Sequence, residues 1–101
     1  PIEYRQISIK PYYVDGAIDN TIYEFLGDYW HGNPVLYKKE DINEVTNTTF
    51  GQLYDKTIAR FDVLVNLGYS IKYIWENEWD AWLTDKTNPL PLKEYNSLIS
   101  F

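Results

Sequence analysis

The sequence contains no cysteine, which excludes a disulfide framework and any zinc site built on thiolates. This is compatible with a reducing cytoplasm, where we expect the protein to reside. No apolar run approaches the roughly 18–20 residues that a membrane-spanning helix needs, and the amino end does not resemble a signal peptide. We therefore expect no membrane partner. Internal repeats, low-complexity tracts and glycine-rich phosphate loops are also absent from the sequence.

Basic residues are scarce: 9 lysines and arginines stand against 15 acids, for a net charge of −6. A nucleic-acid binder that acts alone normally carries a basic patch. If this chain acts on DNA, another module, a dimer or bound cations must supply much of the phosphate affinity. Its 101 residues, 45% of them hydrophobic, suit one globular domain with one core.

The most informative stretch is a predicted hairpin over residues 12–26. Asp19 and Asn20 suit a two-residue loop, because both tolerate positive φ and both flanks are apolar or β-branched. This register places Asp15 opposite Glu24, with Cβ atoms roughly 4.5–5.5 Å apart. Facing carboxylates repel each other, and a divalent cation such as magnesium would compensate them. A register shifted by one residue would separate the pair, and acid pairs on exposed strand faces are commonly only solvated.

A turn carrying the only histidine follows the hairpin. Gly27 and Gly32 bracket residues 28–31, so this turn would bring Asp28 and His31 to the end of the same strand. An imidazole titrates near neutral pH, which suits proton transfer beside two acids. A lone histidine is more often structural or solvated, so this assignment depends on the neighbouring acids.

The rest of the chain predicts a helix packed on a mixed sheet. Apolar residues recur at three- and four-residue steps over residues 50–67, with Thr49 and Gln52 at capping-box spacing and Gly68 as the stop. A strand that follows such a helix favours a parallel position after a crossover. We therefore expect an α/β (α+β) fold, in which an antiparallel meander belongs to a mixed sheet flanked by helices. Strands are expected at 2–9, 12–18, 21–26 and 69–76.

Other charged and aromatic residues have a plain structural interpretation. Trp79 and Trp82, three residues apart, are expected to cover the sheet edge from a helical turn, and base stacking is the less favoured alternative. We also expect a short helical turn at 42–46 and a short helix within 93–101. Four charged residues lie off the centre of the apolar stripe and are expected at the surface unless they border the acid face: Asp55, Lys56, Arg60 and Asp62.

Several motifs together carry a family resemblance. The most specific reads Gly-Asp-Tyr-Trp-His-Gly-Asn-Pro at residues 27–34, and the others lie at 14–16, 22–25, 50–57, 67–69 and 74–76. These motifs resemble endonucleases related to very-short-patch-repair (Vsr) enzymes. The chain is most similar to the phage-type EDxHD homing endonucleases within the PD-(D/E)XK nuclease superfamily, and the resemblance covers roughly residues 13–79.

The resemblance implies a restriction-endonuclease-like fold with its active site on the meander edge. It also implies hydrolysis of phosphodiester bonds in double-stranded DNA with Mg²⁺ or Mn²⁺. By position, Asp15 matches the metal-binding aspartate, Glu24 matches the second acidic position, and the Phe25 carbonyl would be a further metal ligand. His31 matches the family's histidine, an acid, base or phosphate-contacting group. Asp55 best matches a later helix acid.

Two features depart from that family. Leu26 stands where the common lysine would follow the second acid, and Glu3 is no convincing substitute for a first acid on an upstream helix. We therefore expect residues 1–101 to form a single nuclease catalytic domain lacking an upstream helix or a DNA-binding module. In this mechanism Asp28 would orient His31. A palindromic target would imply a homodimer, because two strands need two cuts.

Two alternatives are compatible with the same residues. A non-catalytic nuclease fold that docks DNA or protein agrees with the acidic charge and the missing lysine. A small acidic protein that binds another protein through a tryptophan- and tyrosine-rich surface would account for the 18% aromatic content. It would leave the facing acids of the hairpin unexplained.

Overall fold

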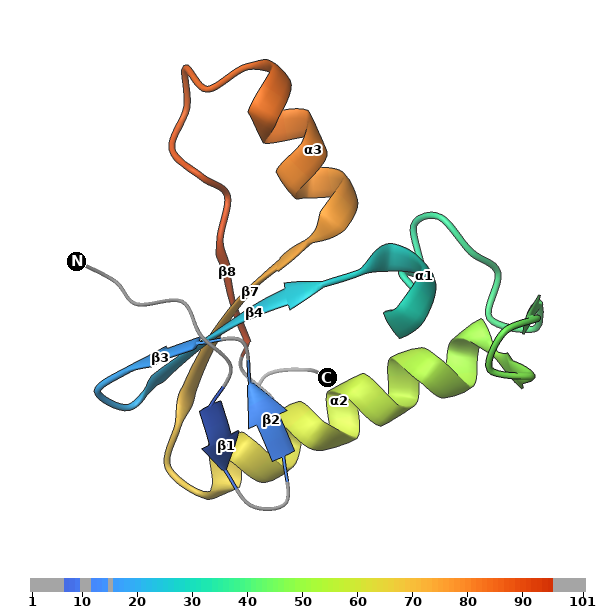
Figure 1. Ribbon diagram of the computed structural model, residues 1–101, viewed down its shortest axis with the longest axis horizontal. Helices are drawn as coiled ribbons and strands as arrows, with labels where there is room; N and C mark the ends of the chain where they lie inside the picture. The colour runs from blue at the N-terminus through green and yellow to red at the C-terminus, as the bar shows by residue number, and fades with distance from the viewer. Residues whose placement is uncertain (1–6, 10–11, 15, 96–101) are drawn as a thin grey trace.

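The computed structural model describes residues 7–9, 12–14 and 16–95, and Figure 1 shows how their elements are arranged. The main sheet has four strands: β3 (Gly16–Ile18), β4 (Thr21–Leu26), β7 (Ser70–Trp75) and β8 (Lys93–Tyr95). Their order in the sheet is β3-β4-β7-β8. The central strands β4 and β7 are parallel, whereas both outer strands are antiparallel to their neighbours. This arrangement confirms the mixed sheet that the sequence predicted.

Helices flank this sheet: α1 (Asp28–His31), α2 (Phe50–Asn66) and α3 (Glu76–Thr84). Figure 1 shows α2 running along one side of the parallel strands β4 and β7, with α3 projecting on the other side. The predicted capping box is present, because the hydroxyl of Thr49 accepts from the backbone N–H of Gln52 at 3.0 Å and the Gln52 side chain accepts in return at 2.9 Å. After α2 the chain turns through Gly68, whose φ is +101°. Across the described ranges, none of the helices has both the length and the apolar character that crossing a membrane requires.

The hairpin has the predicted register, with Gly16 opposite Tyr23 and Ile18 opposite Thr21. Its loop residue Asp19 has a φ of +54°, as expected for a residue type that tolerates the left-handed region. The expected strand over 12–18 is divided, however. Its first part, β2 (Tyr12–Val14), pairs with β1 (Ile7–Ile9) in a separate two-stranded sheet. Asp15 lies outside the described residues, so its pairing with Glu24 stays a prediction.

The core forms where α2 packs on the two parallel strands. Alternate residues of β4 point to this side, and Ile22 and Leu26 are buried there. Phe25 points to the other face, where its ring meets Trp79 of α3 edge-on at 6.3 Å between centroids. Trp79 therefore lies against a face of the sheet at an inner strand, whereas the sequence had placed it over the sheet edge. The buried cluster consists of Ile22, Leu26, Phe61, Leu64, Ile71 and Trp75.

Two short segments differ from the sequence prediction. The expected turn at 42–46 is instead a small hairpin of β5 (Ile42–Asn43) and β6 (Thr48–Thr49). The buried Asn43 explains the difference, because its side-chain oxygen accepts from two backbone N–H groups of the loop, at 2.9 and 3.1 Å. At the carboxyl end, β8 replaces the expected helix over residues 93–95, since the exposed edge of β7 offers backbone partners there.

Candidate functional site

The site lies where the parallel strands end. Because β4 and β7 run in the same direction, their carboxyl ends meet at one edge, and α1 and α3 begin there. In open α/β sheets this edge is the usual place for ligand binding. The first residues of these two helices are joined by a hydrogen bond, in which the backbone N–H of Asp28 donates to the Glu76 carboxylate at 3.1 Å.

The turn after β4 is held by a network centred on Asn33. This side chain is 2% exposed, and its amide donates to the carboxylate of Asp28 at 2.9 Å and to the side-chain oxygen of Asn77 at 3.1 Å. Its own oxygen accepts from the backbone N–H of Val35 at 3.1 Å. Asp28 was expected to orient His31, but its carboxylate is engaged by Asn33 instead. The buried Asp28 therefore stabilises the turn.

Gly32 brings α1 into close contact with the start of α2. Its φ is +64°, and its backbone N–H donates to the carbonyl of Asp28, which ends α1 after a single turn. A side-chain carbon at this position would lie only 2.1 Å from the carbonyl oxygen of Phe50. The close approach explains why glycine follows His31, and it places the imidazole beside α2.

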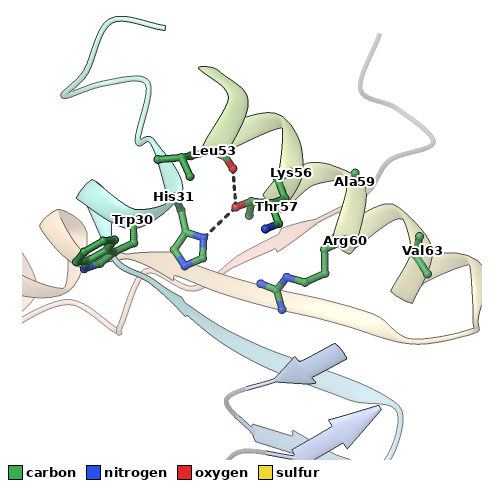
Figure 2. Close-up of a pocket in the computed structure, with 8 residues that line it drawn as sticks. All are labelled: Trp30, His31, Leu53, Lys56, Thr57, Ala59, Arg60 and Val63. Carbon is green, nitrogen blue, oxygen red and sulfur yellow. Dashed lines mark hydrogen bonds between the residues drawn. The ribbon is translucent and has the colours of Figure 1, made fainter. Parts of the chain in front are cut away.

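The imidazole of His31 is oriented by Thr57. Nδ1 of His31 lies 2.9 Å from the Thr57 hydroxyl, and this hydroxyl donates in turn to the carbonyl of Leu53 at 3.1 Å. Figure 2 shows both hydrogen bonds: the one between His31 and Thr57 connects α1 to α2, and the one between Thr57 and Leu53 lies within α2. Thr57 is only 4% exposed, whereas His31 is half-buried, so the contact lies at the border between the protein interior and the surface.

Glu24 forms an ion pair with Arg60. A guanidinium nitrogen of Arg60 contacts the Glu24 carboxylate, and the two side chains are 19% and 3% exposed. Arg60 was expected at the surface unless it bordered the acid face, and the structure brings it to that face. The positive charge compensates the burial of a carboxylate in the core-facing side of β4.

A pocket of about 400 Å³ lies between α1 and α2 (Figure 2). Its charged side chains are those of Lys56 and Arg60, and the His31 ring lines it beside them. Both charged residues of the lining are thus cationic, with Arg60 also paired with the Glu24 carboxylate, although the whole chain carries −6. Such a pocket suits an anionic group, because arginine and lysine both bind phosphate oxygens. The complete lining consists of Trp30, His31, Leu53, Lys56, Thr57, Ala59, Arg60 and Val63.

Magnesium binding requires hard oxygen donors, usually one or two carboxylates with carbonyls and water. Among the predicted ligands, Glu24 and the Phe25 carbonyl are described and have this chemistry, whereas Asp15 lies outside the described residues. No group of three or more histidine or acidic side chains able to hold a metal occurs in the part of the chain that the structure describes. Asp55 is exposed on α2 and is not one of the pocket residues.

The structure thus brings His31 and Glu24 together with three residues that sequence reasoning had not assigned to the site. Lys56 and Arg60 had been interpreted as surface charges, and Thr57 had not been singled out. One signal does exist in the sequence: Leu53, Thr57 and Arg60 recur at steps of four and three, which defines a second stripe on the helix beside the apolar one. The sequence alone could not assign a function to this stripe, because it does not show which segment packs against that side of the helix.

Comparisons of this chain with protein-family models, with curated proteins and with solved structures find no match.

Proposed function

We propose that this chain is the catalytic domain of a metal-dependent endonuclease, of the homing type, that hydrolyses phosphodiester bonds in double-stranded DNA. The observation that supports the proposal most is the pocket in which His31, Lys56 and Arg60 meet, with Arg60 also contacting the buried Glu24. A proton-transfer group, cations and a carboxylate within one site are the components that phosphodiester hydrolysis needs.

The cations would bind the phosphate. The guanidinium of Arg60 presents a planar set of donors that matches phosphate oxygens, and Lys56 adds a second positive charge at the rim of the pocket. Both would stabilise the negative charge that builds on the phosphate oxygens during the reaction.

His31 would move the proton. A water oxygen forms the new bond to phosphorus, and the ester oxygen leaves with the electron pair of the broken P–O bond. His31 accepts the proton of the attacking water and returns it to the departing oxygen. Arg60 holds the carboxylate of Glu24 beside this pocket.

The proposal includes Mg²⁺ or Mn²⁺, held by Asp15, Glu24 and the Phe25 carbonyl. When bound, such an ion lowers the pKa of a coordinated water and neutralises charge on the phosphate. The mixed sheet with its parallel central pair, covered by α2, agrees with a restriction-endonuclease-like fold. The net charge of −6 suggests that a further module or a second copy in a homodimer supplies part of the DNA affinity.

The first test is cleavage of supercoiled plasmid in the presence of Mg²⁺ or Mn²⁺. We expect nicking by the wild-type chain, abolished in Asp15→Asn and Glu24→Gln and reduced at least about a hundredfold in His31→Ala. Glu44→Gln is the matched control, because Glu44 is an exposed acid that does not line the pocket. Circular dichroism establishes that each variant is folded. Full activity in Asp15→Asn or Glu24→Gln would refute the proposed metal site.

One observation favours a second candidate function. Because a guanidinium already neutralises Glu24, the pocket could dock an anionic backbone without cutting it. A non-catalytic DNA-docking module would bind duplex DNA, with Lys56→Gln weakening that binding, yet leave plasmid intact with either metal. This alternative would be favoured if the chain bound DNA without cleaving it. The same result would be expected from a longer chain that carries any neighbouring DNA-binding module.

A further inference from the structure

A second pocket lies between α3 and the sheet. Its volume is about 400 Å³, within the range of roughly 300–1,000 Å³ that is typical of small-molecule sites. Figure 1 shows α3 projecting from the end of β7 and the segment after α3 returning to β8. The apolar walls come from the two inner strands, from α3 and from this returning segment: Phe25, Ile74, Trp79, Trp82, Leu90 and Leu92.

The pocket is built from restrained parts. Trp79 and Trp82 are three residues apart on α3, so their rings lie on the same side of the helix, with centroids 5.5 Å apart. The indole N–H of Trp82 donates to the carbonyl of Asn88 at 2.9 Å, which ties the returning segment to the helix. Pro89 and Pro91 fix φ on either side of the first leucine. A site held in this way loses little conformational entropy when a ligand binds.

The charge around this pocket is negative. Residues 76–95, which comprise α3, the returning segment and β8, carry five acids and two lysines. One of the lysines, Lys93, is paired with the carboxylate of Glu78 at 2.6 Å. Three of the acids are exposed: Asp80, Asp85 and Glu94. Together with the net charge of −6, these carboxylates favour a cationic ligand over an anionic one.

The other lysine shows what the aromatic wall can hold. Nζ of Lys86 lies 5.5 Å from the ring centroid of Trp82, within the distance of a cation–π contact. The face of an aromatic ring attracts an ammonium group because the ring quadrupole is negative there. Trp82 therefore already contacts a protonated amine that belongs to the chain itself. A ligand amine at this ring would compete with Lys86.

We propose that the pocket between α3 and the sheet binds a small organic cation, in which an apolar ring carries a protonated amine. The ring contacts the tryptophans and leucines, and its burial supplies most of the affinity. The face of Trp82 and the surrounding carboxylates select the amine over a neutral or anionic molecule with the same ring. This inference goes beyond the proposed function and does not depend on DNA cleavage or on a metal.

Three indole derivatives test the proposal, because tryptamine, tryptophol and indole-3-acetate share one ring but are cationic, neutral and anionic at about pH 7. Each is titrated into the ¹⁵N-labelled full chain, and the indole N–H resonances of its four tryptophans are followed by NMR. Trp79→Phe and Trp82→Phe assign the resonances of the pocket. We expect these two to shift, with tryptamine binding roughly three- to tenfold more tightly than tryptophol and indole-3-acetate binding most weakly.

Two outcomes of these titrations would overturn the proposal. Equal affinities for the three molecules would show that the pocket does not select a cation. If none of the three shifted the resonances of Trp79 and Trp82, or if only Trp30 in the pocket of the candidate site responded, the pocket beneath α3 would not be the binding site.

Variants locate the contact of the amine. Lys86→Gln removes the competing ammonium, so we expect tryptamine to bind at least about twofold more tightly. Lys38→Gln is the matched control, because it makes the same change in charge at an exposed residue that does not line this pocket, and it should leave the affinity unchanged. An equal change in both variants, or no gain in Lys86→Gln, would overturn the contact with Trp82.

Trp82→Leu keeps an apolar side chain but removes the aromatic face. We expect this variant to lose the preference for tryptamine over tryptophol, and a preserved preference would contradict the proposal. If Trp82→Leu does not fold, the comparison of Lys86→Gln with Lys38→Gln still decides, because both lysines are exposed.

Discussion

The guanidinium of Arg60 contacts the carboxylate of Glu24, although 36 residues separate them in the chain. One comes from the middle of α2 and the other from the core-facing side of β4. The pair lies at the boundary between the apolar core and the pocket that also holds His31. We therefore expect this ion pair to affect both the stability of the domain and the chemistry proposed for the pocket.

The first prediction concerns the stability that this ion pair contributes. Arg60→Met removes the positive charge from a carboxylate that is 3% exposed, and we expect the free energy of unfolding to fall by about 3 kcal/mol. Glu24→Gln in the Arg60→Met background should recover part of this loss, because the buried negative charge is then gone. Urea denaturation of the two single variants and the double variant gives the coupling energy. Additive effects would show that the pair contributes nothing specific.

The second prediction compares two glycines with positive φ. Gly32 and Gly68 have φ values of +64° and +101°, but only at Gly32 would an added carbon clash, at 2.1 Å from the Phe50 carbonyl oxygen. Gly68→Ala should cost about 1–3 kcal/mol from backbone strain alone. Gly32→Ala should cost clearly more, since α1 must move away from α2. Thermal denaturation measures both, and equal losses would contradict the close packing of the two helices.

The third prediction concerns DNA affinity and salt. Lys56 is exposed at the pocket and would contact a phosphate, so Lys56→Gln should weaken duplex binding and lower the slope of log K against log salt by about one. Fluorescence anisotropy at several salt concentrations, with a chelator present, measures this slope. Lys86→Gln is the matched control, because Lys86 lies over the ring of Trp82, outside the pocket. If both variants weakened binding equally, the loss would reflect the change in net charge and not a phosphate contact made by Lys56.

The fourth prediction concerns alkaline pH. Burial raises the pKa of Tyr95, and its 2.5 Å hydrogen bond to the Asp62 carboxylate raises the pKa further. Burial also raises the pKa of Tyr73. The folded state then holds these protons more tightly than the unfolded chain, whose tyrosines titrate near pH 10. The resulting stability is fully present below about pH 10 and is lost as the pH rises through the folded-state pKa.

Urea denaturation at about pH 8.5 and about pH 10.5 tests this sign, because the two values lie on either side of the ordinary tyrosine pKa. The wild type should lose stability between them. Tyr95→Phe should be less stable at the lower pH, since it lacks the bond to Asp62, but should lose less on going to the higher pH. An identical loss in both proteins would show that Tyr95 does not contribute to the alkaline transition.

Local patterns in the sequence predicted much of the fold. The capping box at Thr49 and the apolar periodicity of residues 50–67 predicted α2 to within one residue. The loop at Asp19 predicted the register of the hairpin. These features depend on contacts between residues near one another in the chain, which explains why the sequence alone suffices. The helix expected within 93–101 was wrong over residues 93–95, because pairing with the edge of β7 outweighed local preference there.

The composition of the site required the tertiary structure. The sequence by itself determined that β4 would carry Glu24 and that a glycine-bounded turn would carry His31. Only the packing of α2 decided that Arg60 pairs with Glu24 and that Thr57, rather than Asp28, contacts the imidazole. The physical reason is that periodicity shows which side of a helix is apolar, whereas the angle and depth at which the helix packs on the sheet select the polar side chains at the border that meet the strand.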